Sequence, residues 1–201
     1  MSSTILRDQA LDLVNGLDLD AVRGACALLD EVRNRHGVVL TAGNGGSSST
    51  ASHFAADLAK FTRQPRQPSF RALSLTDNVA CHTAWTNDDD PSLALRHLAE
   101  PWLPSGPDTR DAVVLFSVHG GSLDGDVSNN LVELARHARE RGAFVIGVTG
   151  FDGGALAALS DVHINTPLFE EPYATPAVES VHVLLAHAIC LELSGKTVQQ
   201  R

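Results

Sequence analysis

The chain has 201 residues, of which 43% are hydrophobic and 19% are charged, and its formal net charge is −9. This length suffices for one α/β domain with a full core. The acidic balance argues against nonspecific binding to nucleic acids or anionic membranes. No apolar run predicts a membrane span, and the N-terminus lacks the apolar region of a signal peptide. Cys26, Cys81 and Cys190 form no CxxC pair, which predicts a reduced protein of the cytoplasm.

Apolar periodicity predicts two helices at the N-terminus, over residues 4–17 and 18–36. The next segments alternate between apolar, β-branched runs and helical patterns. The predicted strands are 38–42, 70–75, 112–116, 143–149 and 161–165, and the predicted helices are 48–62, 78–86, 92–99, 128–141, 153–159 and 177–194. This alternation predicts a doubly wound, five-stranded parallel sheet flanked by helices. We therefore expect a single domain over 1–201, with a helical segment, 1–36, before an α/β core, 37–201.

Two Gly- and Ser-rich turns follow predicted strands. The first runs from Thr41 to Thr50 (TAGNGGSSST) and the second from Ser117 to Ser122 (SVHGGS). A turn between a strand and a helix aims backbone N–H groups at an anion, and glycine lets the backbone approach a ligand closely. Because ligands of parallel sheets bind at the carboxyl ends of the strands, the two turns predict a site for a small phosphorylated ligand.

Several motifs together resemble a known family. They are Gly43–Ser47 (GNGGS), His53–Leu58 (HFAADL), Ser74–Asn78 (SLTDN), Thr86–Asp88 (TND), Gly147–Gly154 (GVTGFDGG), and Glu179, His182 and His187 on the last helix. In this order they resemble the sugar isomerase (SIS) domain of the phosphoheptose isomerases, over nearly the whole chain. The resemblance implies an SIS-type sheet and a cytoplasmic enzyme that converts sedoheptulose 7-phosphate into a heptose 7-phosphate. It also implies a homotetramer with active sites between subunits, and often a bound zinc.

The candidate metal site begins with His53 and Asp57, which lie four residues apart and so share one helix face. That spacing also suits an ordinary surface pair. The resemblance adds Glu179 and His187, and imidazole and carboxylate ligands suit zinc or another divalent metal. The family pattern has Glu where Asp57 stands and Gln where Glu179 stands.

Isomerisation through an enediol needs a base at carbon and a group that shuttles protons at the oxygens. We expect Asp57 or Glu179 to move the carbon-bound proton, and His187 to serve the oxygens because imidazole titrates near working pH. His182 is expected to be a packing or interface residue.

The candidate substrate contacts come from both turns. We expect sugar contacts from Asn44, Gly45, Gly46, Ser47 and Asp88, and phosphate contacts from Ser117, Val118, His119, Gly121 and Ser122. Asp88 equally suits a solvated loop, and Ser128 is read as a helix cap. Val118 and His119 replace two hydroxyl residues of the family loop, which leaves open an isomerase for another sugar phosphate. Together with the changes at Asp57 and Glu179, they also leave open a noncatalytic sugar-phosphate-binding regulatory or protein-interaction module.

Overall fold

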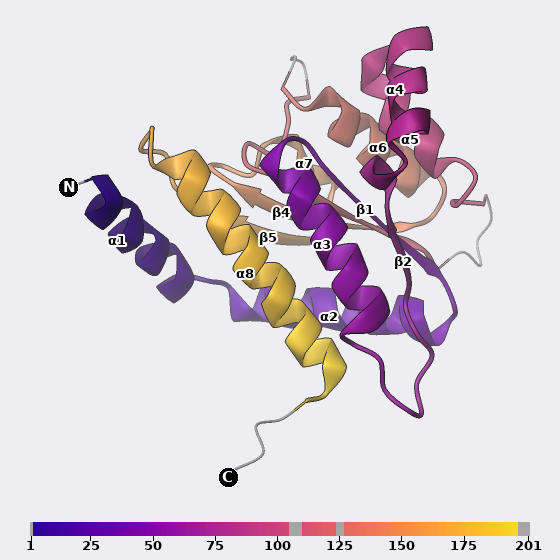
Figure 1. Ribbon diagram of the computed structural model, residues 1–201, viewed down its shortest axis with the longest axis horizontal. Coiled ribbons are helices and arrows are strands. Elements are labelled where there is room, and N and C mark those ends of the chain that lie inside the picture. The colour runs from indigo at the N-terminus through magenta and orange to yellow at the C-terminus, as the bar shows by residue number, and fades with distance from the viewer. Residues whose placement is uncertain (1, 105–109, 124–126, 197–201) are drawn as a thin grey trace.

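The structure is a computed structural model that describes residues 2–104, 110–123 and 127–196 (Figure 1). Its centre is a five-stranded sheet in the order β2-β1-β3-β4-β5, in which every neighbouring pair is parallel. The strands are β1 (Val38–Gly43), β2 (Arg71–Ser74), β3 (Ala112–Ser117), β4 (Phe144–Gly150) and β5 (Val162–Thr166). The predicted five-stranded parallel sheet is confirmed.

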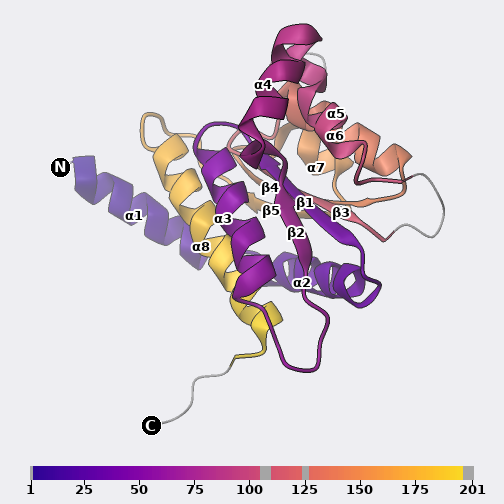
Figure 2. The same ribbon diagram turned by 45° about the vertical axis from the view of Figure 1, so that its right-hand side comes forward.

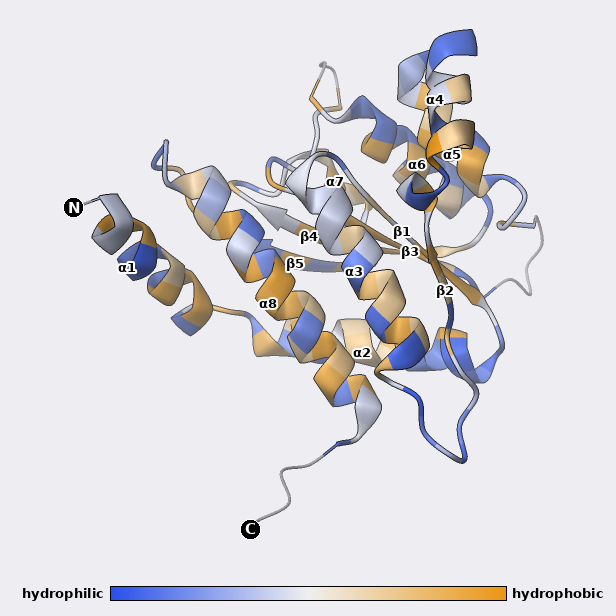
Figure 3. Ribbon diagram, viewed as in Figure 1, coloured by the Kyte–Doolittle hydropathy of each residue, from blue (hydrophilic) through white to orange (hydrophobic). Residues whose placement is uncertain are grey.

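Helices cover both faces of the sheet. The main helices are α1 (Ser2–Asn15), α2 (Leu19–Asn34), α3 (Gly46–Lys60), α4 (Val79–Asp88), α5 (Ala94–Ala99), α6 (Asn129–Glu140), α7 (Gly154–Leu159) and α8 (Ala174–Ser194), and 3₁₀ turns span Leu75–Asp77 and Pro91–Leu93. Apolar residues of α2, α3 and α8 form one core with one face of the sheet, while α5, α6 and α7 form a second core on the other face. The three central strands, β1, β3 and β4, are largely apolar and buried on both faces, whereas the edge strands β2 and β5 include polar, partly exposed residues (Figure 3).

Two helices extend from this body. The N-terminal end of α1 points away from the sheet, and α4 stands out at the opposite side in both views (Figures 1 and 2). None of the residues of α4 is buried, and Val79 at its start is 65% exposed. Helix α4 therefore lies outside both cores, whereas α1 packs against α8 and contributes Leu13 to the first core.

Helix α8 begins at Ala174, three residues earlier than the sequence predicts. Pro176 consequently lies in the first turn, where a missing N–H costs no helical hydrogen bond. Contrary to the sequence expectation, α8 is long and apolar enough for a membrane span by length and composition alone. Half of the relevant window is buried, and its inner face, which includes Val178 and Leu185, belongs to the core. These contacts make α8 a core helix of the α/β domain.

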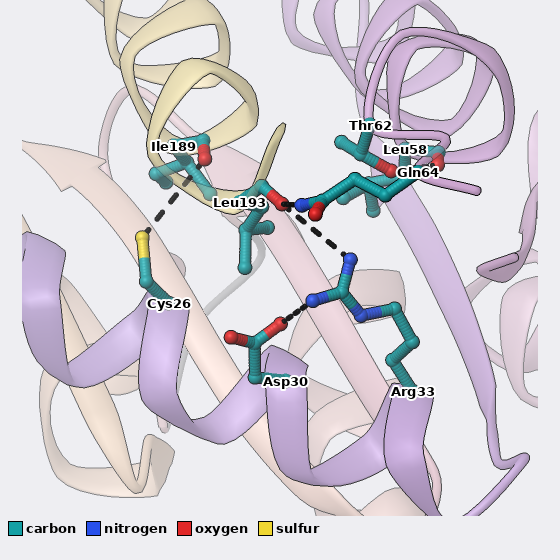
Figure 4. Close-up of polar contacts among 8 residues, drawn as sticks. All are labelled: Cys26, Asp30, Arg33, Leu58, Thr62, Gln64, Ile189 and Leu193. Atoms are coloured by element: carbon teal, nitrogen blue, oxygen red, sulfur yellow. Dashed lines mark hydrogen bonds and ion pairs between the residues drawn. The ribbon is translucent and has the colours of Figure 1, made fainter. Parts of the chain in front are cut away.

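The carboxyl end of α8 is anchored by polar groups from neighbouring elements (Figure 4). The buried guanidinium of Arg33 donates to the carbonyl of Leu193 at 3.4 Å and pairs with Asp30 at 2.5 Å. The amide of Gln64 donates to the same carbonyl at 3.1 Å. These bonds satisfy a carbonyl that the end of a helix leaves without an intrahelical partner, and they fix α8 against α2 and the segment after α3.

Candidate functional site

A cavity of about 180 Å³ lies at the carboxyl ends of β1 and β3. Its lining residues come from the two Gly-rich turns and from the beginning of α8. They are Asn44, Ser47, Ser117, Val118, His119, Ser128, Thr175 and Glu179. Five of the ten predicted substrate contacts line this cavity. Glu179, predicted to be catalytic, is there as well.

Close packing explains the glycines of the first turn. A Cβ on Gly43 would lie 2.5 Å from the backbone of Ser47, and one on Gly46 would lie 2.5 Å from a carboxylate oxygen of Glu179. Gly45 precedes α3 with a φ of +54°, a conformation that other residues adopt only at a cost. The turn therefore brings the N-terminus of α3 directly under the Glu179 carboxylate.

Three helices begin at this cavity. Ser47 lies in the first turn of α3, Ser128 is the N-cap of α6, and Thr175 is the second residue of α8. Each helix has at least 12 residues, so each N-terminus carries the partial positive charge of a helix dipole. No lysine or arginine lines the cavity within the described part of the chain. The helix termini are thus a main source of positive potential there.

The second turn is held between β3 and α7. The hydroxyl of Ser117 accepts the N–H of Gly120 at 3.0 Å. The carbonyls of Gly120 and Gly121, which both have positive φ, accept N–H groups of the first turn of α7 at 2.9 Å. The ring of His119 stacks on Phe151 with centroids 4.3 Å apart. Contacts to β3, α7 and Phe151 therefore fix the shape of this turn.

Ser128, which follows the second turn, brings a hydroxyl to the cavity beside that of Ser117, whereas Ser122 does not. Ser122 lines a separate cavity of about 390 Å³, and its Oγ is buried with no partner among the described residues. Ser128 precedes α6 in a left-handed conformation, with φ of 50°, and its side chain makes no capping hydrogen bond. Ser128 is thus the N-cap of α6, as predicted, but its hydroxyl is not used for capping. The positive φ cannot be read from sequence, so no local signal distinguished the two serines.

Three of the four predicted metal ligands converge between α3 and α8. Ligand atoms of His53, Asp57 and His187 all lie within 4.8 Å of one another. Oδ2 of Asp57 is 3.2 Å from Nδ1 of His187 and 3.5 Å from Nε2 of His53. Both imidazole side chains are about half exposed, at 50% and 51%, whereas that of Asp57 is 25% exposed. Two nitrogen donors and a carboxylate thus face a common point that solvent can reach.

Glu179 lies between the cavity and this group of three. It lines the first cavity and also a neighbouring cavity of about 270 Å³, which His53 borders as well. Asp57 lines neither cavity. Of the two carboxylates, Glu179 is consequently the one that faces the space where a substrate would fit.

Other candidate residues lie elsewhere. Asp88 is at the end of α4, exposed, with its carboxylate accepting the amide of Asn87 at 2.7 Å. Gly121 lines the same separate cavity as Ser122. His182 is fully buried in α8, as its packing role predicts. Burial, with a smaller contribution from the charge of Asp57, raises the pKa of the Cys190 thiol to about 12, so that thiol is not a nucleophile at neutral pH.

Comparisons with known proteins point to one family. Residues 8–150 match the family model described as the SIS domain. The chain is 54% identical over 172 residues to the lincomycin biosynthesis protein LmbN of Streptomyces lincolnensis, covering 86% of this chain but 61% of that protein. The chain thus spans less than two thirds of the length of this relative.

Two further proteins are similar over nearly their full length. The phosphoheptose isomerase of Laribacter hongkongensis is 31% identical over 194 residues, which cover 94% of this chain and 89% of that enzyme. The structure of the phosphoheptose isomerase GmhA from Neisseria gonorrhoeae superposes with a TM-score of 0.77 at 27% identity, covering 97% of this chain and 94% of that one.

Proposed function

The chain belongs to the SIS domain family and, within it, to the phosphoheptose isomerases, and from this premise we propose that it interconverts sedoheptulose 7-phosphate and a heptose 7-phosphate. One observation carries the proposal. A single cavity joins two Gly- and Ser-rich turns at the carboxyl ends of parallel strands with a carboxylate, Glu179, that also borders a His–Asp–His group. One small molecule in this cavity could therefore have its phosphate bound by the turns while the carboxylate of Glu179 moves one of its protons.

The phosphate would bind at the end of the cavity formed by β3 and α6. The hydroxyls of Ser117 and Ser128 are its proposed donors there, with His119 beside them. The N-termini of α3, α6 and α8 supply partial positive charge, which stabilises an anion without a lysine or arginine. The sugar would extend toward Asn44 and Ser47, whose short polar side chains can bind hydroxyl groups.

The three converging residues fit a divalent metal such as zinc. Two imidazole nitrogens and one carboxylate oxygen within 4.8 Å of one another form a donor set that zinc prefers. His53, Asp57 and His187 would hold the ion. When bound, it would act as a Lewis acid that stabilises negative charge on a substrate oxygen. As a ligand, His187 could not also exchange oxygen protons, so its predicted acid–base role belongs to a metal-free site.

Glu179 is our proposed base at carbon. Its carboxylate faces the cavity, whereas Asp57 is engaged by both imidazoles and is one methylene shorter than the Glu of the family pattern. Glu179 would remove the proton from C1 of the ketose and return it to C2 of the enediol. The proton of the C1 hydroxyl would pass to the oxygen on C2 through solvent, giving the aldose. Asn44 and Ser47 would orient the hydroxyls at these carbons during the transfer.

The oligomeric state and the cellular location are also part of the proposal. We propose a cytoplasmic homotetramer with active sites between subunits. Two observations support the assembly. The side chains of His53 and His187 are half exposed, and α8 presents Leu184 and Leu191, 42% and 51% exposed, on its outer side. The altered second turn supports one alternative, an isomerase for another sugar phosphate. The changes at Val118, His119, Asp57 and Glu179 together support the other, a noncatalytic binding module.

Proton NMR of sedoheptulose 7-phosphate in D₂O tests the activity directly. We expect a new aldose signal and deuterium at the isomerised carbon. We also expect Glu179→Gln to lower kcat by about 100-fold or more, because general base catalysis contributes roughly that much. Thermal protection by the sugar phosphate without exchange or product would refute the isomerase and favour a binding module. Full activity in Glu179→Gln would show that Glu179 is not the base and would favour Asp57 in that role.

Metal content gives a readout that does not depend on turnover. We expect stoichiometric zinc after reconstitution and its loss in Asp57→Asn. A second His–carboxylate pair offers a matched control: Nε2 of His97 lies 2.9 Å from Asp89, which no second imidazole contacts in the described ranges. Asp89→Asn should leave the metal content unchanged. Equal loss in both variants, or no bound zinc in the unaltered protein, would contradict the metal site.

A further inference from the structure

Asn44 and Asn130 form a reciprocal amide pair at the rim of the cavity. Nδ2 of Asn44 donates to Oδ1 of Asn130 at 3.0 Å, and Nδ2 of Asn130 donates to Oδ1 of Asn44 at 2.8 Å. The two residues are 86 positions apart in the sequence. Asn44 follows β1 and Asn130 lies in the first turn of α6. The pair therefore links the first Gly-rich turn to the helix that follows the second.

The backbone of α6 settles the orientation of both amides. Oδ1 of Asn130 also accepts the N–H of Leu131 at 3.0 Å. This oxygen cannot exchange places with the amide nitrogen without directing an N–H group at another N–H group. The nitrogen of Asn130 must therefore face the oxygen of Asn44, and the nitrogen of Asn44 must face the oxygen of Asn130. An amide torsion is otherwise broad and nearly two-fold.

The pair leaves a defined set of bonding groups on Asn44. An amide has two N–H donors and two acceptor positions, and the pair uses one of each. Asn44 also lines the first cavity. Its second donor and second acceptor are consequently presented to a ligand in a fixed arrangement. Without Asn130, rotation of the amide would exchange the donor and the acceptor.

We propose that Asn130 is a positioning residue that fixes the amide orientation of Asn44 and so determines which sugar hydroxyls the cavity accepts. This inference rests on the proposed function, because Asn44 is there a contact of the sugar. Asn130 does not line the first cavity but a neighbouring one of about 340 Å³, which Asn44 and Ser128 border as well. It acts on the sugar through Asn44.

The amide pair can be tested without substrate. The side-chain NH₂ signal of Asn44 in ¹⁵N–¹H spectra is assigned by its loss in Asn44→Ala. We expect it to shift in Asn130→Ala and in Asn130→Asp, since aspartate accepts from Asn44 but cannot donate to it. Asn129→Ala, which removes the neighbouring amide, should leave the signal in place. An unchanged signal in both Asn130 variants would overturn the proposal.

A double-variant cycle tests the consequence for the sugar. We expect Asn130→Ala to raise KM for sedoheptulose 7-phosphate about five- to tenfold, the effect of roughly one lost hydrogen bond, with a smaller change in kcat. In the Asn44→Ala background the same change should alter KM by less than about twofold. An equal rise in both backgrounds would show a structural role and refute the positioning role.

These outcomes also separate the inference from the proposed function. If the unaltered protein neither turns over nor binds the sugar phosphate, the proposed function fails. The NMR signal of Asn44 still decides whether Asn130 orients that amide. If the unaltered protein is active and Asn130→Ala leaves KM unchanged, the proposed function stands and the inference fails.

Discussion

Acidification should destabilise this protein through His182, whose imidazole is fully buried between α8 and the sheet. The only hydroxyl proton of Thr166 is donated to the carbonyl of Thr149 at 2.9 Å. The contact of 3.2 Å between Thr166 and Nε2 of His182 therefore has the imidazole as its donor. Nδ1 of His182 is then the bare nitrogen, and it is buried without a partner among the described residues. Protonation would place an unpaired charge in the core.

The size of the effect follows from the pKa of His182. Burial lowers this pKa from 6.5 to about 4, and the nearby backbone of Thr149 raises it by a smaller amount. Because the folded-state pKa lies below the unfolded value, the stabilisation is complete above about pH 6.5 and is lost as the pH falls toward 4. At about pH 5 the loss relative to pH 8 is roughly 2 kcal/mol. That is a substantial part of the stability of a typical domain.

Urea denaturation at about pH 8 and pH 5 measures this loss, and His182→Gln provides the comparison. Glutamine keeps an N–H donor for Thr166 but does not titrate. The variant should be less stable at pH 8, yet its free energy of unfolding should fall by about 2 kcal/mol less on acidification. An NMR titration should show the imidazole still neutral at about pH 5. An equal fall in both proteins, or protonation of His182 near pH 6.5, would refute the reasoning.

Two further predictions concern the anchor of α8 and the phosphate end of the cavity. Arg33→Met should lower the free energy of unfolding by about 1–3 kcal/mol, because a buried guanidinium and its hydrogen bonds are lost. Arg35→Met, which removes an exposed pair, should cost no more than about 0.5 kcal/mol in the same urea experiment, and equal costs would contradict the anchoring role. Ser128→Ala should raise KM for the sugar phosphate about five- to tenfold, whereas Ser122→Ala should change it by less than about twofold. A larger rise in KM for Ser122→Ala than for Ser128→Ala would show that Ser122, rather than Ser128, contacts the phosphate.

The sequence by itself determined the architecture and the family. The three central strands, β1, β3 and β4, were predictable because their apolar runs are nearly continuous, which reflects burial on both faces of a parallel sheet. The two Gly-rich turns were predictable because only glycine permits the tight approach of Gly43 to Ser47 in the first and of Gly120 to Gly153 in the second. The helical spacing of His53 and Asp57 placed both on one face of α3.

Only the tertiary structure decided which of the candidate residues meet. Helical spacing cannot bring His187 to within 3.2 Å of Asp57, because that distance depends on how α8 packs against α3. Ser128 reaches the cavity through a left-handed backbone conformation, and Asn130 reaches Asn44 across 86 residues. Local sequence patterns depend on the hydrogen bonding and burial of a single helix, strand or turn. Contacts between elements arise from the packing of the whole core, so the composition of the site could be proposed from the sequence but not its geometry.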